Sequence, residues 1–281
     1  MKLKAIQNLF HEELKLIFPS QEIDSFFYML IDRYYGVSRI QLATSRDKSV
    51  PDASKIIESL GLLKKEKPIQ YILGDTIFFG LPLKVNENVL IPRPETEELV
   101  EWVLKYARTT NEIKILDVGT GSGSIAVSLA SHLPDATIYG LDISSKALKV
   151  AKDNAQINKV NVNFIEADIL SLDCIKDVEF DIIVSNPPYV REKEKKQMKA
   201  NVLNNEPHLA LFVKDNDALK FYKGIIKFSR ISLKSGGMLF FEINEYLGKD
   251  MIALFQAHEF SKVVLKQDMF KKDRMIKGIK G

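Results

Sequence analysis

From residue 113 onward, short apolar segments alternate with longer segments of helical period. A short apolar run bounded by polar residues is typical of a strand that is buried on both faces. Strands that alternate with helices form parallel sheets with helices on both sides. The sequence therefore predicts an α/β fold with a Rossmann-like, mostly parallel sheet. The predicted strands are Ile113–Val118, Thr137–Asp142, Val162–Ala167, Phe180–Ser185 and Met238–Ile243, and the predicted helices are Ile125–His132, Lys146–Asn158 and about 217–233.

The two ends of the chain differ from this central pattern. The last apolar segments, Lys262–Gln267 and Met275–Ile279, predict an antiparallel hairpin that closes the sheet. Residues 1–75 have apolar positions at helical spacing and predict a small N-terminal helical bundle. The period becomes strand-like at residue 76, so we expect a β-hairpin linker over residues 76–91 and a larger domain over residues 92–281.

Composition argues against several classes of protein. No apolar run approaches the roughly 20 residues that span a bilayer, so we expect no membrane partner and a cytoplasmic location. The chain has one cysteine, Cys174, and four scattered histidines, so neither an internal disulfide nor a metal site is expected. The net charge is +3, and residues 1–75 hold 11 basic and 10 acidic side chains. A nucleic-acid binder usually concentrates positive charge, so no stable nucleic-acid partner is expected.

The segment Asn186-Pro187-Pro188-Tyr189 directly follows a predicted strand. Each proline fixes its own φ, donates no backbone hydrogen bond and restricts the residue before it. The result is a stiff strand end that presents a side-chain amide and unpaired backbone carbonyls. Such a group can hold a planar NH2 group by accepting its hydrogens. Asn186 is therefore a candidate catalytic residue.

A glycine-rich segment and two acids follow other predicted strands. Asp117-Val-Gly119-Thr120-Gly121-Ser122-Gly123 has glycines at every second residue, which fits neither a dinucleotide fingerprint nor an NTPase loop. Asp142 ends the next strand, where an acid typically holds a ribose hydroxyl pair. Asp168 could accept a hydrogen bond from an adenine amino group, with Ile169 against the ring. A plain strand-to-helix turn and a loop acid remain alternatives for the glycines and for Asp168, but ligands bind at this edge of open α/β sheets.

Together these motifs resemble those of the class I S-adenosylmethionine-dependent methyltransferases. The Asn-Pro-Pro-Tyr motif resembles that of enzymes that methylate an exocyclic or amide nitrogen, among them adenine-N6 enzymes of DNA or RNA and the N5-glutamine methyltransferases of peptide chain release factors. Three further segments resemble the release factor family: Pro68–Gly74 followed by Phe78-Phe79-Gly80, Leu90–Glu97, and Asn205–Ala210. With the helical domain, this resemblance covers nearly the whole chain.

The resemblance implies transfer of a methyl group from S-adenosyl-L-methionine to the side-chain amide of glutamine in the Gly-Gly-Gln tripeptide of class I release factors. We expect residues 92–281 to be the catalytic domain and the chain to be a monomer. Because residues 1–75 carry no catalytic motif and a hairpin separates them from the rest of the chain, we expect them to dock the release factor. Ile169 departs from relatives that carry an aromatic residue there. The residues implied in catalysis are Asn186, Pro187 and Tyr189, those in substrate binding are Asn186, Pro187, Pro188 and Tyr189, and those in cofactor binding are Asp117, Gly119, Thr120, Gly121, Ser122, Gly123, Asp142, Ile143, Asp168, Ile169 and Asn186.

Two other functions remain open at this point. An adenine-N6 methyltransferase would use the same motif, but it would need a target-recognition module and a basic surface for the nucleic-acid backbone. A non-catalytic module that only binds S-adenosylmethionine or a translation factor would not need Asn186. Comparing methylation of a release factor with methylation of nucleic acid separates these alternatives.

Overall fold

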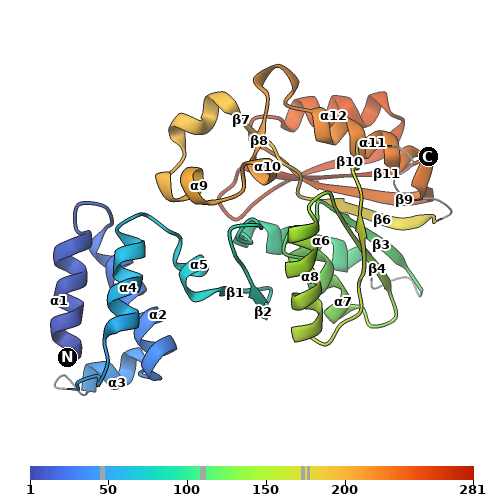
Figure 1. The fold of residues 1–281 in the computed structure, drawn as a ribbon. Coiled ribbons are helices and arrows are strands. Elements are labelled where there is room, and N and C mark those ends of the chain that lie inside the picture. Colours follow the sequence, from blue (N-terminus) through green and yellow to red (C-terminus); the bar gives the residue numbers. More distant parts are fainter. Residues whose placement is uncertain (45–47, 108–111, 172–174, 176–177) are drawn as a thin grey trace. The chain divides into compact units, whose positions relative to one another are not determined.

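The computed structural model describes residues 1–281 except 45–47, 108–111, 172–174 and 176–177, so Cys174 lies outside the described residues. Contacts divide the chain into two compact units (Figure 1). Unit 1 comprises Met1–Gly74 and Lys199–Asn205, and unit 2 comprises Asp75–Met198 and Glu206–Gly281. Among the described residues, no helix is long and apolar enough to cross a membrane.

Unit 1 is a helical bundle around its own apolar core. Leu3, Ile6 and Phe10 recur every three or four residues, so one face of the first helix is buried. The second helix ends at Gly36, which adopts the left-handed conformation that glycine tolerates best. The helical bundle agrees with the prediction, although residues 199–205 were not predicted to join it. The helices are α1 (Leu3–Leu14), α2 (Ser20–Tyr35), α3 (Arg39–Thr44), α4 (Ser54–Leu63) and α5 (Ile69–Leu73), together with α9 (Ala200–Asn205).

The described residues of unit 2 form a seven-stranded sheet in the order β10-β11-β9-β6-β3-β4-β5. The pairs β4–β5, β3–β4, β3–β6 and β6–β9 are parallel, and β11 pairs antiparallel with β9 and β10. The mostly parallel sheet and its closing antiparallel hairpin are thereby confirmed. The strands are β3 (Lys114–Val118), β4 (Thr137–Asp142), β5 (Asn163–Glu166), β6 (Phe180–Ser185), β9 (Leu233–Glu242), β10 (Phe260–Gln267) and β11 (Asp273–Lys280).

Helices cover both faces of this sheet (Figure 1). Leu99 of α6 (Pro94–Ala107), Leu129 of α7 (Ser124–His132) and Ala155 of α8 (Ser145–Ile157) belong to the apolar core on one face. Tyr222 of α11 (Lys220–Ser232) and Phe255 of α12 (Gly248–Ala257) belong to the core on the other. The side chains of alternate strand residues fill these two cores, because successive residues of a strand point to opposite faces.

The hairpin ahead of the sheet is shorter than expected. It consists of β1 (Asp75–Phe78) and β2 (Leu81–Lys84), and in the described chain residues 85–91 form no strand. Phe79 and Gly80 turn the chain with φ of 50° and 77°. By its contacts the hairpin belongs to unit 2, and its role as a linker stays a prediction. Short elements after β6 were not predicted: β7 (Val190–Arg191), the 3-10 helix η1 (Glu192–Gln197), α10 (His208–Leu211), β8 (Phe212–Val213) and the 3-10 helix η2 (Asp215–Asp217).

The strand order reverses at β3. The chain passes from β3 to β4 and β5 on one side, and then returns to place β6 on the other side of β3. In open α/β sheets, ligands bind beyond the carboxyl ends of the strands at such a switch point. Ser185 lies beside Val118 in the register, and its hydroxyl donates to the Val118 carbonyl at 2.6 Å. The glycine-rich loop after β3 and the Asn-Pro-Pro-Tyr segment after β6 therefore begin side by side.

Candidate active site

A pocket of about 320 Å³ lies at this edge of unit 2. Its walls come from the loops after β3, β4, β5 and β6 and from the segments 88–90 and 207–210. Ligand pockets are commonly apolar with a few polar groups that fix orientation, and here apolar side chains such as Leu141 and Ile225 surround a few polar ones. The predicted site residues that line it are Gly119, Gly121, Asp142, Ile143, Asp168, Ile169, Asn186, Pro187 and Pro188.

The glycine-rich loop has its shape because of positive φ angles. Gly119, Gly121 and Gly123 have φ of 72°, 55° and 80°, which side-chain-bearing residues rarely adopt. A Cβ on Gly119 would meet no other described atom within 4 Å, and one on Gly121 would meet only the Gly119 carbonyl at 4.0 Å. Gly123 differs, because a Cβ there would lie 3.1 Å from that of Ala151. The first two glycines thus leave open space beside the pocket, and the third allows close helix packing.

Asp142 faces the pocket with both carboxylate oxygens already held in place. Oδ2 accepts a hydrogen bond from the Gly121 amide at 2.9 Å, and Oδ1 accepts one from the Ser144 amide at 2.9 Å. Burial raises the pKa of Asp142, and the two amides work in the opposite direction. Each oxygen keeps a second lone pair that can accept from a ligand hydroxyl. The geometry is therefore suited to a pair of neighbouring hydroxyl groups.

Four of the predicted cofactor residues, Asp117, Thr120, Ser122 and Gly123, are not among those that line the pocket. Asp117 is fully buried, and its Oδ2 accepts from the Thr120 hydroxyl at 2.6 Å and from the Ala126 amide at 3.2 Å. Burial raises the pKa of Asp117 to about 7. Its Oδ1 has no hydrogen-bond partner among the residues that the structure describes. These residues shape the loop from beneath, and direct cofactor contact by them stays a prediction.

Asp168 behaves as a loop acid and also lines the pocket, so its contact with an adenine amino group stays a prediction. Its Oδ1 accepts from the Leu170 amide at 2.9 Å, which is the behaviour of a loop acid. It also lines the pocket, as does the buried Ile169 next to it. Ile143, whose side chain is half exposed, lines the same cavity after β4. An apolar wall with one acid at its rim fits a flat heteroaromatic ring that carries an amino group.

The Asn186-Pro187-Pro188 segment directly follows β6 and forms one wall of the pocket. The Asn186 Nδ2 donates to the Thr96 hydroxyl at 3.2 Å. Tyr189 is not among the lining residues, and its hydroxyl donates to Glu242 Oε1 at 2.9 Å. Burial raises the pKa of Tyr189 well above its usual value, and the Glu242 carboxylate adds to this rise. Contact between the Tyr189 ring and a substrate stays a prediction.

Sequence reasoning did not identify four polar residues around the site. Glu206, nearly inaccessible to solvent, accepts from the Arg93 guanidinium at 2.5 Å and from the Ile91 amide at 3.2 Å. This bond set joins the segments 88–91 and 206–210, both of which supply pocket walls. Thr96 and Glu242 lie behind Asn186. Glu242 had a visible signal, since it is an acid within the apolar run Met238–Ile243, but its partner Thr96 is distant in sequence.

Comparison with known proteins agrees with this geometry. A family model described as a methyltransferase domain matches residues 109–277. The chain is 49% identical to a release factor glutamine methyltransferase of Flavobacterium psychrophilum over 99% of both chains. It is 40% identical to one of Bacteroides thetaiotaomicron over 98% of this chain and 99% of that one. In fold it is similar to a Thermus thermophilus 16S rRNA N2 methyltransferase solved with AdoMet and guanosine (TM-score 0.54, 16% identity, 74% of this chain and 50% of that chain).

The sheet order, the glycine loop and the family model together define a methyltransferase domain of the class I, S-adenosylmethionine-dependent type. Within that class, the near full-length identity decides the family. The chain belongs to the release factor glutamine methyltransferases.

Proposed function

We propose that this protein transfers the methyl group of S-adenosyl-L-methionine to the side-chain amide nitrogen, N5, of the glutamine in the Gly-Gly-Gln tripeptide of class I release factors. One observation carries the proposal: Asn186 and Pro187 line the same pocket as Asp142 and the open glycine loop. A methyl donor and a planar NH2 group can therefore meet in one cavity. Membership of the release factor glutamine methyltransferases supports glutamine as the acceptor.

The pocket residues fit S-adenosylmethionine. Asp142 would accept hydrogen bonds from the two ribose hydroxyls, because each of its oxygens retains a free lone pair. Asp168 would accept from the adenine amino group, with Ile143 and Ile169 against the ring. The space beside Gly119 and Gly121 leaves room for the amino acid part of the cofactor. When bound, the cofactor supplies a methyl group on a positively charged sulfur.

Asn186 and Pro187 would do the work of orienting the acceptor. An amide nitrogen is a poor nucleophile because its lone pair is delocalised into its own carbonyl. The Asn186 Oδ1 and the Pro187 carbonyl would each accept one hydrogen of the glutamine NH2 group, which aims the nitrogen at the methyl group. These acceptors also stabilise the positive charge that develops on nitrogen during transfer. We propose that the Tyr189 ring limits which side chains can enter.

No general base is needed for this transfer. The amide nitrogen oriented by Asn186 and Pro187 would accept the methyl group with its own lone pair and would then lose one proton to water. Bound S-adenosylmethionine would supply the methyl group, and its sulfur would keep the electron pair of the broken bond. The protein contributes geometry and electrostatics, while the reactive group belongs to the cofactor.

We further propose that unit 1 docks the body of the release factor and that the chain acts as a monomer. The nearly balanced charge of +3 supports the absence of a stable nucleic-acid partner. Because release factors are translation factors, the proposed place of action is the cytoplasm.

The test is an assay with methyl-labelled S-adenosylmethionine and purified release factor. We expect label in the wild-type release factor and none in a variant whose Gly-Gly-Gln glutamine is replaced by alanine. Duplex DNA and RNA serve as competing acceptors in the same assay. Equal labelling of the wild-type release factor and its alanine variant would overturn the proposed function. Stronger labelling of nucleic acid than of release factor would overturn it as well.

A further inference from the structure

We propose that Thr96 and Glu242 are positioning residues that hold the Asn186 amide in the one orientation that supports methyl transfer. The inference rests on the proposed function, in which the Asn186 side-chain oxygen accepts a hydrogen bond from the glutamine amide. Asn186 Nδ2 lies 3.2 Å from the Thr96 hydroxyl oxygen, and that hydroxyl lies 2.6 Å from Glu242 Oε2. Thr96 is 3% exposed and Glu242 is 1% exposed, so water does not compete for these bonds.

The direction of the hydrogen bonds follows from the chemistry of the three groups. The positive charge of Arg274 favours the ionised form of Glu242. In that form the carboxylate only accepts, so the single hydroxyl hydrogen of Thr96 is donated to Glu242. The Thr96 oxygen can then only accept, and of the two ends of the Asn186 amide only the NH2 group donates. A flipped amide would place Asn186 Oδ1 against an oxygen with no hydrogen to offer. The Oδ1 of Asn186 is thereby directed away from Thr96 and left for an N–H donor in the pocket.

Register explains why Glu242 is available for this task. Ser185 of β6 pairs with Phe241 of β9, so the next residues along the parallel strands are Asn186 and Glu242. Phe240 belongs to the core on the side of α6, and Glu242, two residues later, points to the same face. Thr96 lies in the first turn of α6 and therefore meets it there. Sheet register and helix packing bring the three side chains together from separate parts of the sequence.

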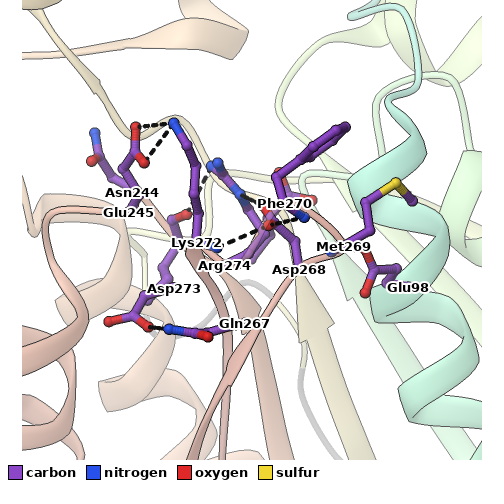
Figure 2. A network of polar contacts seen from close by, with 12 residues as sticks. Glu98, Asn244, Glu245, Gln267, Asp268, Met269, Phe270, Lys272, Asp273 and Arg274 are labelled. Carbon is purple, nitrogen blue, oxygen red and sulfur yellow. Dashed lines mark hydrogen bonds and ion pairs between the residues drawn. The ribbon is translucent and has the colours of Figure 1, made fainter.

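The same carboxylate also holds the other end of the motif. Glu242 Oε1 accepts from the Tyr189 hydroxyl at 2.9 Å while Oε2 accepts from Thr96. Tyr189 is thus bonded to Glu242 directly, and Asn186 is linked to Glu242 through Thr96. Burial raises the pKa of Glu242, and the positive charge of Arg274 works against this rise. Arg274 is held by Asp268, whose Oδ2 accepts from its Nε at 3.1 Å, as Figure 2 shows.

A matched pair of substitutions at Thr96 tests the role. Thr96→Val keeps the size of the side chain and removes the hydroxyl, whereas Thr96→Ser keeps the hydroxyl and removes a methyl group. We expect Thr96→Val to lower kcat for release factor methylation by about tenfold to a hundredfold, because the Asn186 amide loses its fixed orientation. We expect Thr96→Ser to stay within about threefold of wild type, because a serine hydroxyl makes the same two bonds.

Binding is measured alongside turnover. The Kd for S-adenosylmethionine by calorimetry and the KM for release factor should change by no more than about threefold in Thr96→Val, since orientation of the acceptor affects the transfer step rather than binding. Trp102 fluorescence reports whether unit 2 is folded, because Trp102 is the one tryptophan of the chain and lies in α6. An unchanged kcat in Thr96→Val, or equal losses in Thr96→Val and Thr96→Ser, would overturn the proposal.

Glu242→Met provides a second, independent test. It removes the acceptor of the Thr96 hydrogen, which can then turn towards Asn186 and permit the flipped amide. If both residues act through one chain of bonds, the double variant Thr96→Val/Glu242→Met should lose no more activity than the worse single variant. Multiplying losses would contradict the shared role. Failure of wild-type protein to methylate release factor would instead contradict the proposed function, so the two failures are distinguishable.

Discussion

At the scale of single residues, the pocket separates groups that bind the cofactor from groups that act on the acceptor. Asp142→Ala removes both acceptors for the ribose hydroxyls, and we expect the Kd for S-adenosylmethionine to rise at least about tenfold, since hydrogen bonds to charged groups contribute about 1.5–3 kcal/mol. Asn186→Ala should lower kcat about a hundredfold or more and leave that Kd within about threefold. Calorimetry and single-turnover labelling measure the two quantities. Equal loss of affinity in both variants would assign Asn186 to cofactor binding.

The buried Asp117 predicts a specific dependence of stability on pH. Burial raises its folded-state pKa from 3.8 to about 7. Below pH 4 both states hold the proton, so the contribution of Asp117 to stability is fully present. As the pH rises from 4 to 7, the unfolded chain releases the proton and the folded protein keeps it, so the free energy of unfolding falls by up to about 4 kcal/mol. Above pH 7 the loss is complete.

The variant Asp117→Asn keeps an oxygen for Thr120 and Ala126 but cannot ionise. We therefore expect its free energy of unfolding, relative to wild type, to increase between pH 4 and pH 7 and to stay level from pH 8. Urea unfolding followed by Trp102 fluorescence measures this difference for unit 2. All other titrating groups occur in both proteins and cancel. A difference that does not vary with pH would show that the Asp117 pKa is close to its ordinary value.

Nine of the residues that line the pocket could be predicted from the sequence, because they lie at or just after the ends of strands on the same edge of a parallel sheet. Asp142, Asp168 and Asn186 all line one pocket, as that rule requires. Thr96 and Glu242 could not be paired in this way. They are 146 residues apart, and only the register of β6 with β9 and the packing of α6 bring them together. A local sequence pattern shows where a strand ends. A contact such as that between Thr96 and Glu242 forms only when distant segments pack together.

At the scale of elements, the strands were predicted more closely than the connections. Residues 180–185 and 137–142 form strands with the predicted bounds, because buried apolar runs bounded by polar residues have a clear period. The charged segment 191–196 gave no such signal. It lies largely within a 3-10 helix whose Glu194 accepts bonds from Arg191 and from Asn244. This contact depends on Asn244, which lies just after β9 and far from Glu194 in the sequence, so the local pattern around residues 191–196 does not reveal it.

The turn between β10 and β11 is held by one buried carboxylate, as Figure 2 shows. Asp268 Oδ1 accepts from the amides of Phe270 and Lys272 at 2.9 and 3.0 Å, and Oδ2 accepts from Arg274. Asp268→Ala would leave two amides and a guanidinium without this acceptor. We expect the free energy of unfolding of unit 2 to fall by about 2–4 kcal/mol, measured by urea unfolding with Trp102 fluorescence.

Gln267 of the same hairpin supplies the control for this prediction. Its Nε2 donates to Asp273 at 3.2 Å in an exposed position. Since exposed polar contacts contribute little, Gln267→Ala should change the free energy of unfolding by no more than about 0.5 kcal/mol. Similar losses in both variants would mean that the hairpin depends on its general polarity rather than on the Asp268 acceptor.

At the scale of the whole molecule, the candidate active site lies in one of the two units. Every residue that lines the pocket belongs to unit 2, and unit 1 has its own apolar core around residues such as Phe10 and Phe27. Residues 199–205 leave unit 2 to join unit 1, where Asn205 Nδ2 donates to the Glu66 carbonyl at 3.2 Å. The sequence predicted the helical bundle from its period, but not this crossing segment, which has no long apolar pattern.

If unit 1 docks the release factor, its deletion should affect affinity for the protein substrate and not the chemistry. We expect removal of residues 1–74 to raise the KM for intact release factor about tenfold or more, which corresponds to at least about 1.4 kcal/mol of lost binding. The Kd for S-adenosylmethionine should not change, because the pocket lies within unit 2. A short peptide with the Gly-Gly-Gln tripeptide is the matched control, since we expect it to occupy the pocket alone and to be methylated with the same kcat and KM by both proteins. Trp102 fluorescence checks that unit 2 remains folded. An unchanged KM for release factor, with the peptide control equal in both proteins, would place the docking surface in unit 2.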